Sequence, residues 1–218
     1  LSATVKNKNA VLKFLTSKRE AKILNVEETS TPKIEILETN SRVPWSGHMA
    51  SYAIEAIYQK IKKSSLTIIF VNTRAQAELV FNKLWQENDN NLRIAIHHGS
   101  LEKEIRRKVE SLMSLGKIDC VVATSSLDLG IDWGDVDLVV QIGSPKGISR
   151  FLQRIGRSNH RFDEPSNALL VPSNRFEYLE CLSAINSIKN KLLDETREKK
   201  GSLDVLAQHV VGVSCSEP

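Results

Sequence analysis

The stretch LTIIFVNTRAQAELVFNKLW, residues 66–85, joins a short apolar run directly to a segment with helical periodicity. Residues 66–71 are rich in β-branched and aromatic side chains, which favour a buried strand. In the residues that follow, apolar side chains recur every three or four positions, as on one face of an amphipathic helix. They are Ala77, Val80, Phe81 and Leu84. A strand that leads at once into a helix is the repeating unit of a parallel sheet.

The same alternation continues along the chain. Further strands are expected at residues 92–96, 119–124, 137–142 and 167–172. Helices are expected at 48–64, 74–88, 101–115 and 147–156, and a final one begins near Asn174. The apolar stripe expected for the helix at 101–115 consists of Ile105, Val109, Leu112 and Met113. This order predicts an α/β fold, a doubly wound parallel sheet with helices on both faces.

Polar loops follow four of the expected strands. In a parallel sheet the carboxyl ends of the strands share one edge, and ligands bind along that edge. The loops are NTR at 72–74, HHGS at 97–100, TSSLDLGID at 124–132 and GSPKG at 143–147. We therefore expect function at these loops. Outside this region, residues 1–47 have weak periodicity and suggest a linker, and a polar break at 197–202 precedes a new apolar segment.

Composition limits the class of protein. The chain has 218 residues, 41% of them hydrophobic, which is enough for one domain with a small appendage. Its formal net charge of +4 permits an anionic partner without requiring one. Cys120, Cys181 and Cys215 are odd in number and far apart, which argues against a disulfide framework and for a reducing compartment. No apolar run approaches the ~20 residues that cross a membrane, so we expect a soluble, cytoplasmic protein.

The loop at 72–74 carries a helix-capping pattern. Thr73 stands three residues before Gln76, as in a capping box. A helix that begins at the ligand edge also offers free N–H groups and a positive dipole to a phosphate. Asn72 and Arg74 would add further donors. A purely structural cap and a phosphate site are both compatible with this pattern.

The next two loops combine histidines, hydroxyls and glycines. His97 and His98 should point to opposite faces of a strand, and packing or hydrogen bonding is favoured over catalysis or zinc binding for both. Gly99 allows the backbone to approach a ligand closely. Hydroxyls at Thr124, Ser125 and Ser126 suit phosphate contacts, and Asp132 could accept hydrogen bonds from a ribose. Ordinary turn chemistry explains these last residues equally well.

Arginines recur at helical spacing near the stretch LQRIGRSNHR, residues 152–161. Arg150, Arg154, Arg157 and Arg161 could grip phosphate oxygens and stabilise charge that develops during phosphoryl transfer. A solvated basic face is the alternative. The sequence contains no GxxxxGK[ST] loop and no acidic pair after a strand, so a nucleotide site that uses these arginines would lie mainly elsewhere.

Four motifs in order now resemble a known family. IIFVNTRAQAE, HHGS, VVATSSLDLGIDWGDVDLVVQ and QRIGRSNHR, between residues 68 and 161, resemble the second RecA-like domain of superfamily 2 helicases. The sequences of these motifs are most similar to those of the large helicase-related (Lhr) branch and, within it, to those of bacterial ligase-associated DEXH-box helicases. LSAT at the start resembles the motif that closes the first motor domain and couples ATP to movement, through Ser2 and Thr4. The match departs at SNHR, one residue longer than the usual TGR, with Asn159 in place of glycine.

The resemblance implies a division of the chain and a set of roles. Residues 1–47 would be the end of the first motor domain and a linker, 48–195 the RecA-like helicase C-terminal domain, and 196–218 the start of a winged-helix domain. Arg157 and Arg161 would be arginine fingers. Gly130, Asp132, Gln153 and Arg154 would contact the nucleotide. Asn72, Thr73, Arg74, His98, Gly99, Thr124 and Ser125 would hold the nucleic acid.

The same resemblance implies cofactors and partners. ATP with Mg²⁺ would be shared with a first RecA-like domain, whose phosphate loop this sequence lacks. The expected substrate is single-stranded DNA or a DNA–RNA hybrid, and movement would run 3′ to 5′. DNA ligase and nuclease partners in repair, a monomeric state and no membrane partner also follow from it. A non-catalytic nucleic-acid-binding module of the same fold remains the alternative. A small-molecule enzyme on a doubly wound sheet is disfavoured, because no GxGxxG follows the first apolar strand.

Overall fold

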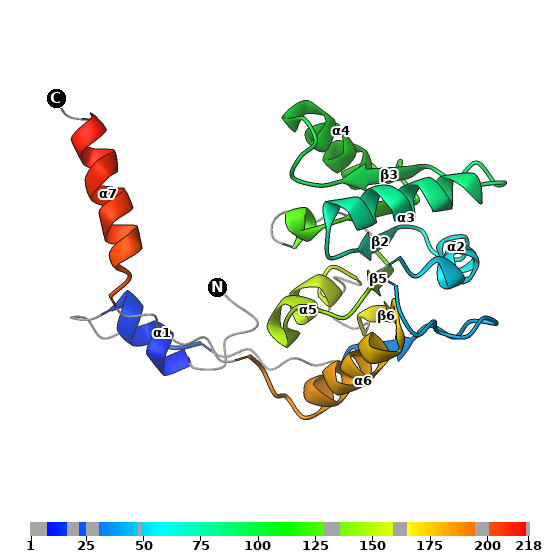
Figure 1. The fold of residues 1–218 in the computed structure, drawn as a ribbon, viewed down its shortest axis with the longest axis horizontal. Coiled ribbons are helices and arrows are strands. Elements are labelled where there is room, and N and C mark those ends of the chain that lie inside the picture. The colour runs from blue at the N-terminus through cyan, green and yellow to red at the C-terminus, as the bar shows by residue number, and fades with distance from the viewer. Residues whose placement is uncertain are drawn as a thin grey trace.

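Six parallel strands form one sheet in the part of the chain that the computed structural model describes (Figure 1). The described residues are 8–16, 22–24, 31–47, 49–128, 136–158, 165–194 and 201–216. The strands are β1 (Lys33–Ile36), β2 (Thr67–Phe70), β3 (Ile94–His97), β4 (Cys120–Ala123), β5 (Leu138–Ile142) and β6 (Asn167–Val171). Their order across the sheet is β1-β6-β5-β2-β4-β3. The predicted parallel α/β sheet is confirmed.

Helices connect these strands as the periodicity predicts. The α-helices are α1 (Lys8–Leu15), α2 (Ile54–Ile61), α3 (Arg74–Gln86), α4 (Lys103–Ser114), α5 (Ile148–Ile155), α6 (Arg175–Lys189) and α7 (Leu203–Ser216). Two 3₁₀ turns, η1 (Ser51–Ala53) and η2 (Ser125–Leu127), precede α2 and follow β4. No helix among the described residues is long and apolar enough to cross a lipid bilayer.

Alternate side chains of the central strand β2 enter two separate cores. Ile69 faces one core with apolar side chains from α2 and α3. Ile68 and Phe70 face the other core, with side chains from α4, α5 and α6. Connections that progress toward β3 cross the first face and those that progress toward β1 cross the second, as a uniform crossover handedness requires. The sheet is therefore doubly wound, and the loops after its strands share one edge.

The structure differs from the sequence-based expectation at β1 and on α4, and it adds the helix α1 within the expected linker. Lys33–Ile36, inside the expected linker, is the edge strand β1, which pairs with β6. Its alternating charged and apolar residues gain strand structure from that pairing, and the segment is too short to signal itself. On α4, Ile105 is 45% exposed, whereas Val109 and Met113 are buried. The helix therefore packs through its second half, and the predicted apolar stripe is too long.

The last helix, α7, begins where the polar break ends. None of its side chains is buried, and its apolar residues remain exposed. The expected start of a new segment at this point agrees with the helix boundary, and α7 contributes nothing to either core of the sheet.

Candidate nucleic-acid and nucleotide interface

The loop after β2 caps α3 through both residues of the predicted capping box, although Gln76 bonds the N–H of Asn72 rather than that of the N-cap Thr73. Thr73 Oγ1 accepts a hydrogen bond from Gln76 N at 3.2 Å, and Gln76 Oε1 accepts one from Asn72 N at 3.0 Å. Thr73 has extended backbone geometry and is the N-cap of α3. Because Thr73 and Arg74 are exposed, the first turn of α3 presents its donors to solvent at the carboxyl edge of the sheet.

Asn72 links the loops after β2 and β5. Its Nδ2 donates to the carbonyl oxygen of Ser144 at 3.0 Å. Gly143 has φ +80°, and a Cβ at this position would lie 2.9 Å from Asn72 Nδ2. The glycine is therefore required both by its backbone conformation and by the close approach of this amide.

An exposed arginine, Arg74, and a buried histidine, His98, both approach the carboxylate of Glu78. Arg74 Nε donates to Glu78 Oε1 at 3.0 Å, and His98 Nε2 lies 3.6 Å from that oxygen. Arg74 is exposed, but His98 is only 4% exposed, so its ring lies beneath the loop rather than on its surface. Gly99 is exposed, and a Cβ there would meet nothing within 4 Å. Its open surroundings leave room for a ligand to approach the backbone.

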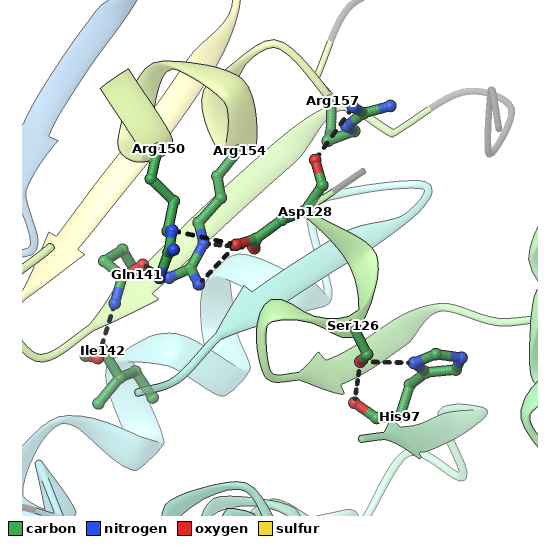
Figure 2. Close-up of polar contacts among 8 residues, drawn as sticks. All are labelled: His97, Ser126, Asp128, Gln141, Ile142, Arg150, Arg154 and Arg157. Carbon is green, nitrogen blue, oxygen red and sulfur yellow. Dashed lines mark hydrogen bonds and ion pairs between the residues drawn. The ribbon is translucent and has the colours of Figure 1, made fainter. Parts of the chain in front are cut away.

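Thr124 and Ser125 stand at the end of β4, in a turn that His97 fastens to β3. Thr124 N donates to the carbonyl oxygen of His97 at 3.2 Å, and Ser126 Oγ donates to the same oxygen at 3.0 Å. His97 Nδ1 lies 2.8 Å from Ser126 Oγ (Figure 2). On the other side of the ring, His97 Nε2 lies 3.1 Å from Glu110 Oε1. Burial lowers the pKa of His97, and Glu110 opposes that shift. The predicted hydrogen-bonding role of His97 is confirmed.

Arg154 on α5 is a buried residue, and each of its three guanidinium nitrogens donates a hydrogen bond. Its Nε donates to Asp128 Oδ1 at 2.7 Å, and its two terminal nitrogens reach Gln141 Oε1 at 2.6 Å and Asp128 Oδ2 at 3.3 Å. The guanidinium carbon lies 4.7 Å from the centroid of the Phe70 ring. Arg154 was expected at the nucleotide, yet in this conformation its contacts are internal.

Two more arginines, one on α5 and one just after it, approach Asp128 (Figure 2). Arg150 is 54% exposed, and its Nε lies 3.6 Å from Asp128 Oδ2. Arg157, half-buried just after the helix, donates to the carbonyl oxygen of Asp128 at 3.1 Å. Arg157 therefore lies beside the segment that follows β4, which also holds Thr124 and Ser125. Gln153 is half-buried on the same helix.

Five predicted site residues lie outside the described part of the chain. They are Ser2, Thr4, Gly130, Asp132 and Arg161. Among the residues that the structure does describe, no group of three His, Cys, Asp or Glu side chains could hold a metal ion.

Sequence reasoning gave no role to Asp128 or Gln141, which together anchor Arg154. Only Gln141 carried a signal in the sequence. Gln141 is a polar residue within the apolar run of β5, and it is fully buried. Asp128 lies in a loop rich in turn residues, where its carboxylate was indistinguishable from turn chemistry. A buried arginine is unusual, and a buried polar residue in an expected strand is the place to look for its partner.

Comparison with known proteins points to one family. A profile described as the helicase conserved C-terminal domain matches residues 50–162. An ATP-dependent helicase Lhr-Core protein 2 of Thermococcus barophilus is 35% identical over 225 residues, covering 98% of this chain and 26% of the relative. An ATP-dependent helicase Lhr-Core of Methanocaldococcus jannaschii is also 35% identical, over 98% of this chain and 26% of its own length.

One solved structure is similar to this chain along its whole length. The helicase Lhr of Mycobacterium smegmatis, bound to single-stranded DNA and AMP-PNP, has a TM-score of 0.87 and 32% sequence identity. The match covers 100% of this chain and 29% of that protein. The chain thus spans about a quarter of the length of the curated relatives it matches. The RecA-like class predicted for the fold and the resemblance to the Lhr branch are both confirmed.

Proposed function

Because the chain belongs to the family of helicase conserved C-terminal domains, we propose that it is the second motor domain of an Lhr-type, ATP-dependent helicase. The observation that carries this proposal is the shared edge of the sheet. The capped start of α3 and the turn after β4 stand there together, and Arg157 contacts the end of that turn. One edge thus offers hydrogen-bond donors for the phosphates of a nucleic acid and a guanidinium for a nucleotide. A motor needs both, because it couples the binding of these two ligands.

The nucleic-acid side of this edge would consist of donors for backbone phosphates. Thr73 and Arg74 are exposed at the start of α3, and Asn72 is held beside them by Ser144. The hydroxyls of Thr124 and Ser125 would extend the row to the next strand. Contacts of this kind fix the position of a single strand without reading its sequence. The Mycobacterium smegmatis relative, which binds single-stranded DNA, supports this assignment.

His98 and Gly99 would serve the same strand in different ways. The buried His98 ring would support the loop from below, through Glu78. Gly99 would let a phosphate approach the backbone, where its surroundings are open. DNA–RNA hybrids remain part of the proposal, as does 3′-to-5′ movement.

The nucleotide side would be completed by a first RecA-like domain. ATP would supply the free energy of its hydrolysis, and the Mg²⁺ that accompanies it would be held by that other domain. From this chain, Arg157 and Arg161 would bring positive charge to the phosphates, with Gly130, Asp132 and Gln153 nearby. Arg154 would act on the nucleotide only indirectly. Its buried ion pair with Asp128 fixes α5, and α5 sets the backbone position of Arg157. A guanidinium placed this way stabilises the charge that develops during transfer.

The flanking parts of the chain are assigned by the same proposal. Residues 1–47 would close the first motor domain and link it to this one, with Ser2 and Thr4 as coupling residues. Residues 48–195 would form the RecA-like domain, joined by β1 at its edge. Residues 196–218 would begin a winged-helix domain. A cytoplasmic location is supported by the free cysteines Cys120, Cys181 and Cys215. Repair partners such as DNA ligase or a nuclease, and a monomeric state, rest on the resemblance alone.

The deciding experiment measures ATP hydrolysis by the full-length protein with and without single-stranded DNA. We expect DNA-stimulated hydrolysis in the wild type and a loss of about 10³-fold or more for Arg157→Ala, with DNA binding retained. Arg150→Ala is the matched control, because it removes an exposed guanidinium from α5, the helix that Arg157 follows. Normal hydrolysis by Arg157→Ala would contradict the finger assignment. A wild type without stimulated hydrolysis would favour a non-catalytic binding module.

A second test uses the chain alone. The 218-residue sequence contains no GxxxxGK[ST] loop, so we expect no ATP hydrolysis from it in isolation. Hydrolysis that follows the protein through successive purification steps would overturn this expectation.

A further inference from the structure

A row of neighbouring residues leads from Asn72 along the carboxyl edge of the sheet to α6. Asn72 reaches the loop after β5, where a Cβ on Gly143 would lie 3.6 Å from Glu177 Oε2. Glu177 Oε2 in turn accepts a hydrogen bond from Ser173 N at 2.8 Å, after β6. The edge that carries the proposed hydrogen-bond donors to phosphate therefore extends past β5 and β6 to the first turn of α6.

At the end of this row of residues, α6 holds the segment 43–47 and its tryptophan. Asn174 Nδ2 donates to the carbonyl oxygen of Gly47 at 3.0 Å. Arg175 donates from its backbone N to the carbonyl oxygen of Pro44 at 3.0 Å and from its Nε to that of Val43 at 3.3 Å. These three hydrogen bonds hold the segment in a fixed position against the start of α6, so the side chain between them is positioned as well.

Trp45 is positioned but not buried. Its ring centroid lies 4.1 Å from the guanidinium carbon of Arg175, yet the residue is 68% exposed. Phe176, the next residue along α6, is 70% exposed. Burial of a tryptophan or phenylalanine would stabilise the fold, so folding does not explain why both aromatic side chains are left exposed. Indole, phenyl and guanidinium surfaces are the groups on which nucleic-acid bases stack.

We propose that Trp45, supported by Arg175, is a stacking platform for a base of the single strand whose phosphates lie at Asn72 and Thr73. This inference rests on the proposed nucleic-acid function. The positive charge of Arg175 complements a phosphate backbone, and the platform is continuous with the proposed phosphate row. Such a platform would hold a base of any identity, because every base offers a flat face. The competing occupant is an apolar protein surface, which would also cover the exposed Leu179 further along α6.

The test separates base contacts from phosphate contacts. Binding of the full-length protein is measured by fluorescence anisotropy to an ordinary single strand and to a strand of equal length with abasic residues throughout. We expect Trp45→Ala to weaken binding to the ordinary strand by about 5- to 100-fold, and Trp45→Phe to retain most of the affinity. On the abasic strand the wild type and Trp45→Ala should bind equally.

Trp85 provides the matched control. It is 58% exposed and stacks on Phe81, but it lies in the last turn of α3, away from the carboxyl edge of the sheet. Trp85→Ala should bind both strands like the wild type. Equal losses for Trp45→Ala on the two strands, or no loss on either, would overturn the platform and favour a protein occupant or a purely structural tryptophan.

Failure of the underlying function gives a different result. If the edge does not bind nucleic acid, Asn72→Ala and Thr73→Ala will leave binding to both strands unchanged. If the phosphate row is right and the platform wrong, those two variants will lose affinity for both strands while Trp45→Ala behaves like the wild type.

Discussion

Arg154 and Asp128 form an ion pair in which both side chains are buried. Their side chains are 5% and 8% exposed, and Arg154 Nε donates to Asp128 Oδ1 at 2.7 Å. The pair joins α5 to the end of η2, two elements that follow different strands. Arg157 lies three residues beyond Arg154 and contacts the carbonyl oxygen of the same aspartate. The ion pair therefore fixes the backbone position of Arg157, the proposed arginine finger.

Removal of the Arg154 guanidinium should strongly destabilise the fold. Arg154→Ala leaves the Asp128 carboxylate buried without its main cation, and we expect a loss of about 3–5 kcal/mol in the free energy of unfolding. Arg154→Lys should not restore it, because an ammonium cannot donate to Asp128 and Gln141 in the geometry of a planar guanidinium. Urea unfolding of the three proteins checks the prediction.

Arg150→Ala is the control for that series. Its side chain is 54% exposed and 3.6 Å from Asp128, so its removal should change the free energy of unfolding by less than about 1 kcal/mol. An Arg154→Ala protein that is as stable as Arg150→Ala would show that the buried pair does not hold α5 in place.

Gly143 and Gly99 should respond differently to the same substitution. Gly143 has φ +80° and stands against Asn72 Nδ2, so Gly143→Ala should cost about 1–3 kcal/mol and disturb the Asn72 side chain. Gly99 has open surroundings, so Gly99→Ala should change stability by less than about 0.5 kcal/mol. Thermal unfolding of both variants tests this pair. Equal stability of the two would mean that the loop after β5 relaxes freely.

The sequence predicted the parts of this structure that depend on local signals. Four of the apolar runs are central strands, and Thr73 caps α3 by accepting a hydrogen bond from Gln76 N, as their spacing indicates. Two features were not predictable, because they depend on partners distant in the chain. β1 gains its strand structure from β6, and the burial of Arg154 depends on Asp128, 26 residues away.

Stability should fall at mildly acidic pH through His97. Burial lowers the pKa of His97 in the folded protein, whereas in the unfolded chain it returns to about 6.5. Above that pH both states are neutral. As the pH falls below it, the unfolded state takes up a proton first, so the free energy of unfolding decreases until folded His97 is also protonated.

The measurement compares urea unfolding of the wild type and His97→Gln across this range. We expect the wild type to lose more stability on acidification than His97→Gln does. His209→Gln, which removes an exposed histidine on α7, serves as the control for the loss of one histidine. A His97→Gln protein with the full wild-type pH dependence would assign the effect to another group.

Arg74 should contribute one phosphate contact to the binding of a single strand. Each such contact releases counterions, so the affinity of the full-length protein should fall with salt, and Arg74→Ala should reduce the slope of log K against log salt by about 0.7. Arg93→Ala removes the same charge from the opposite edge of the sheet, where Arg93 pairs with Asp119 just before β4. Titrations over a range of salt concentrations should leave the slope of Arg93→Ala at the wild-type value. If both variants reduce the slope equally, the effect is one of net charge, and Arg74 does not contact a phosphate at this edge.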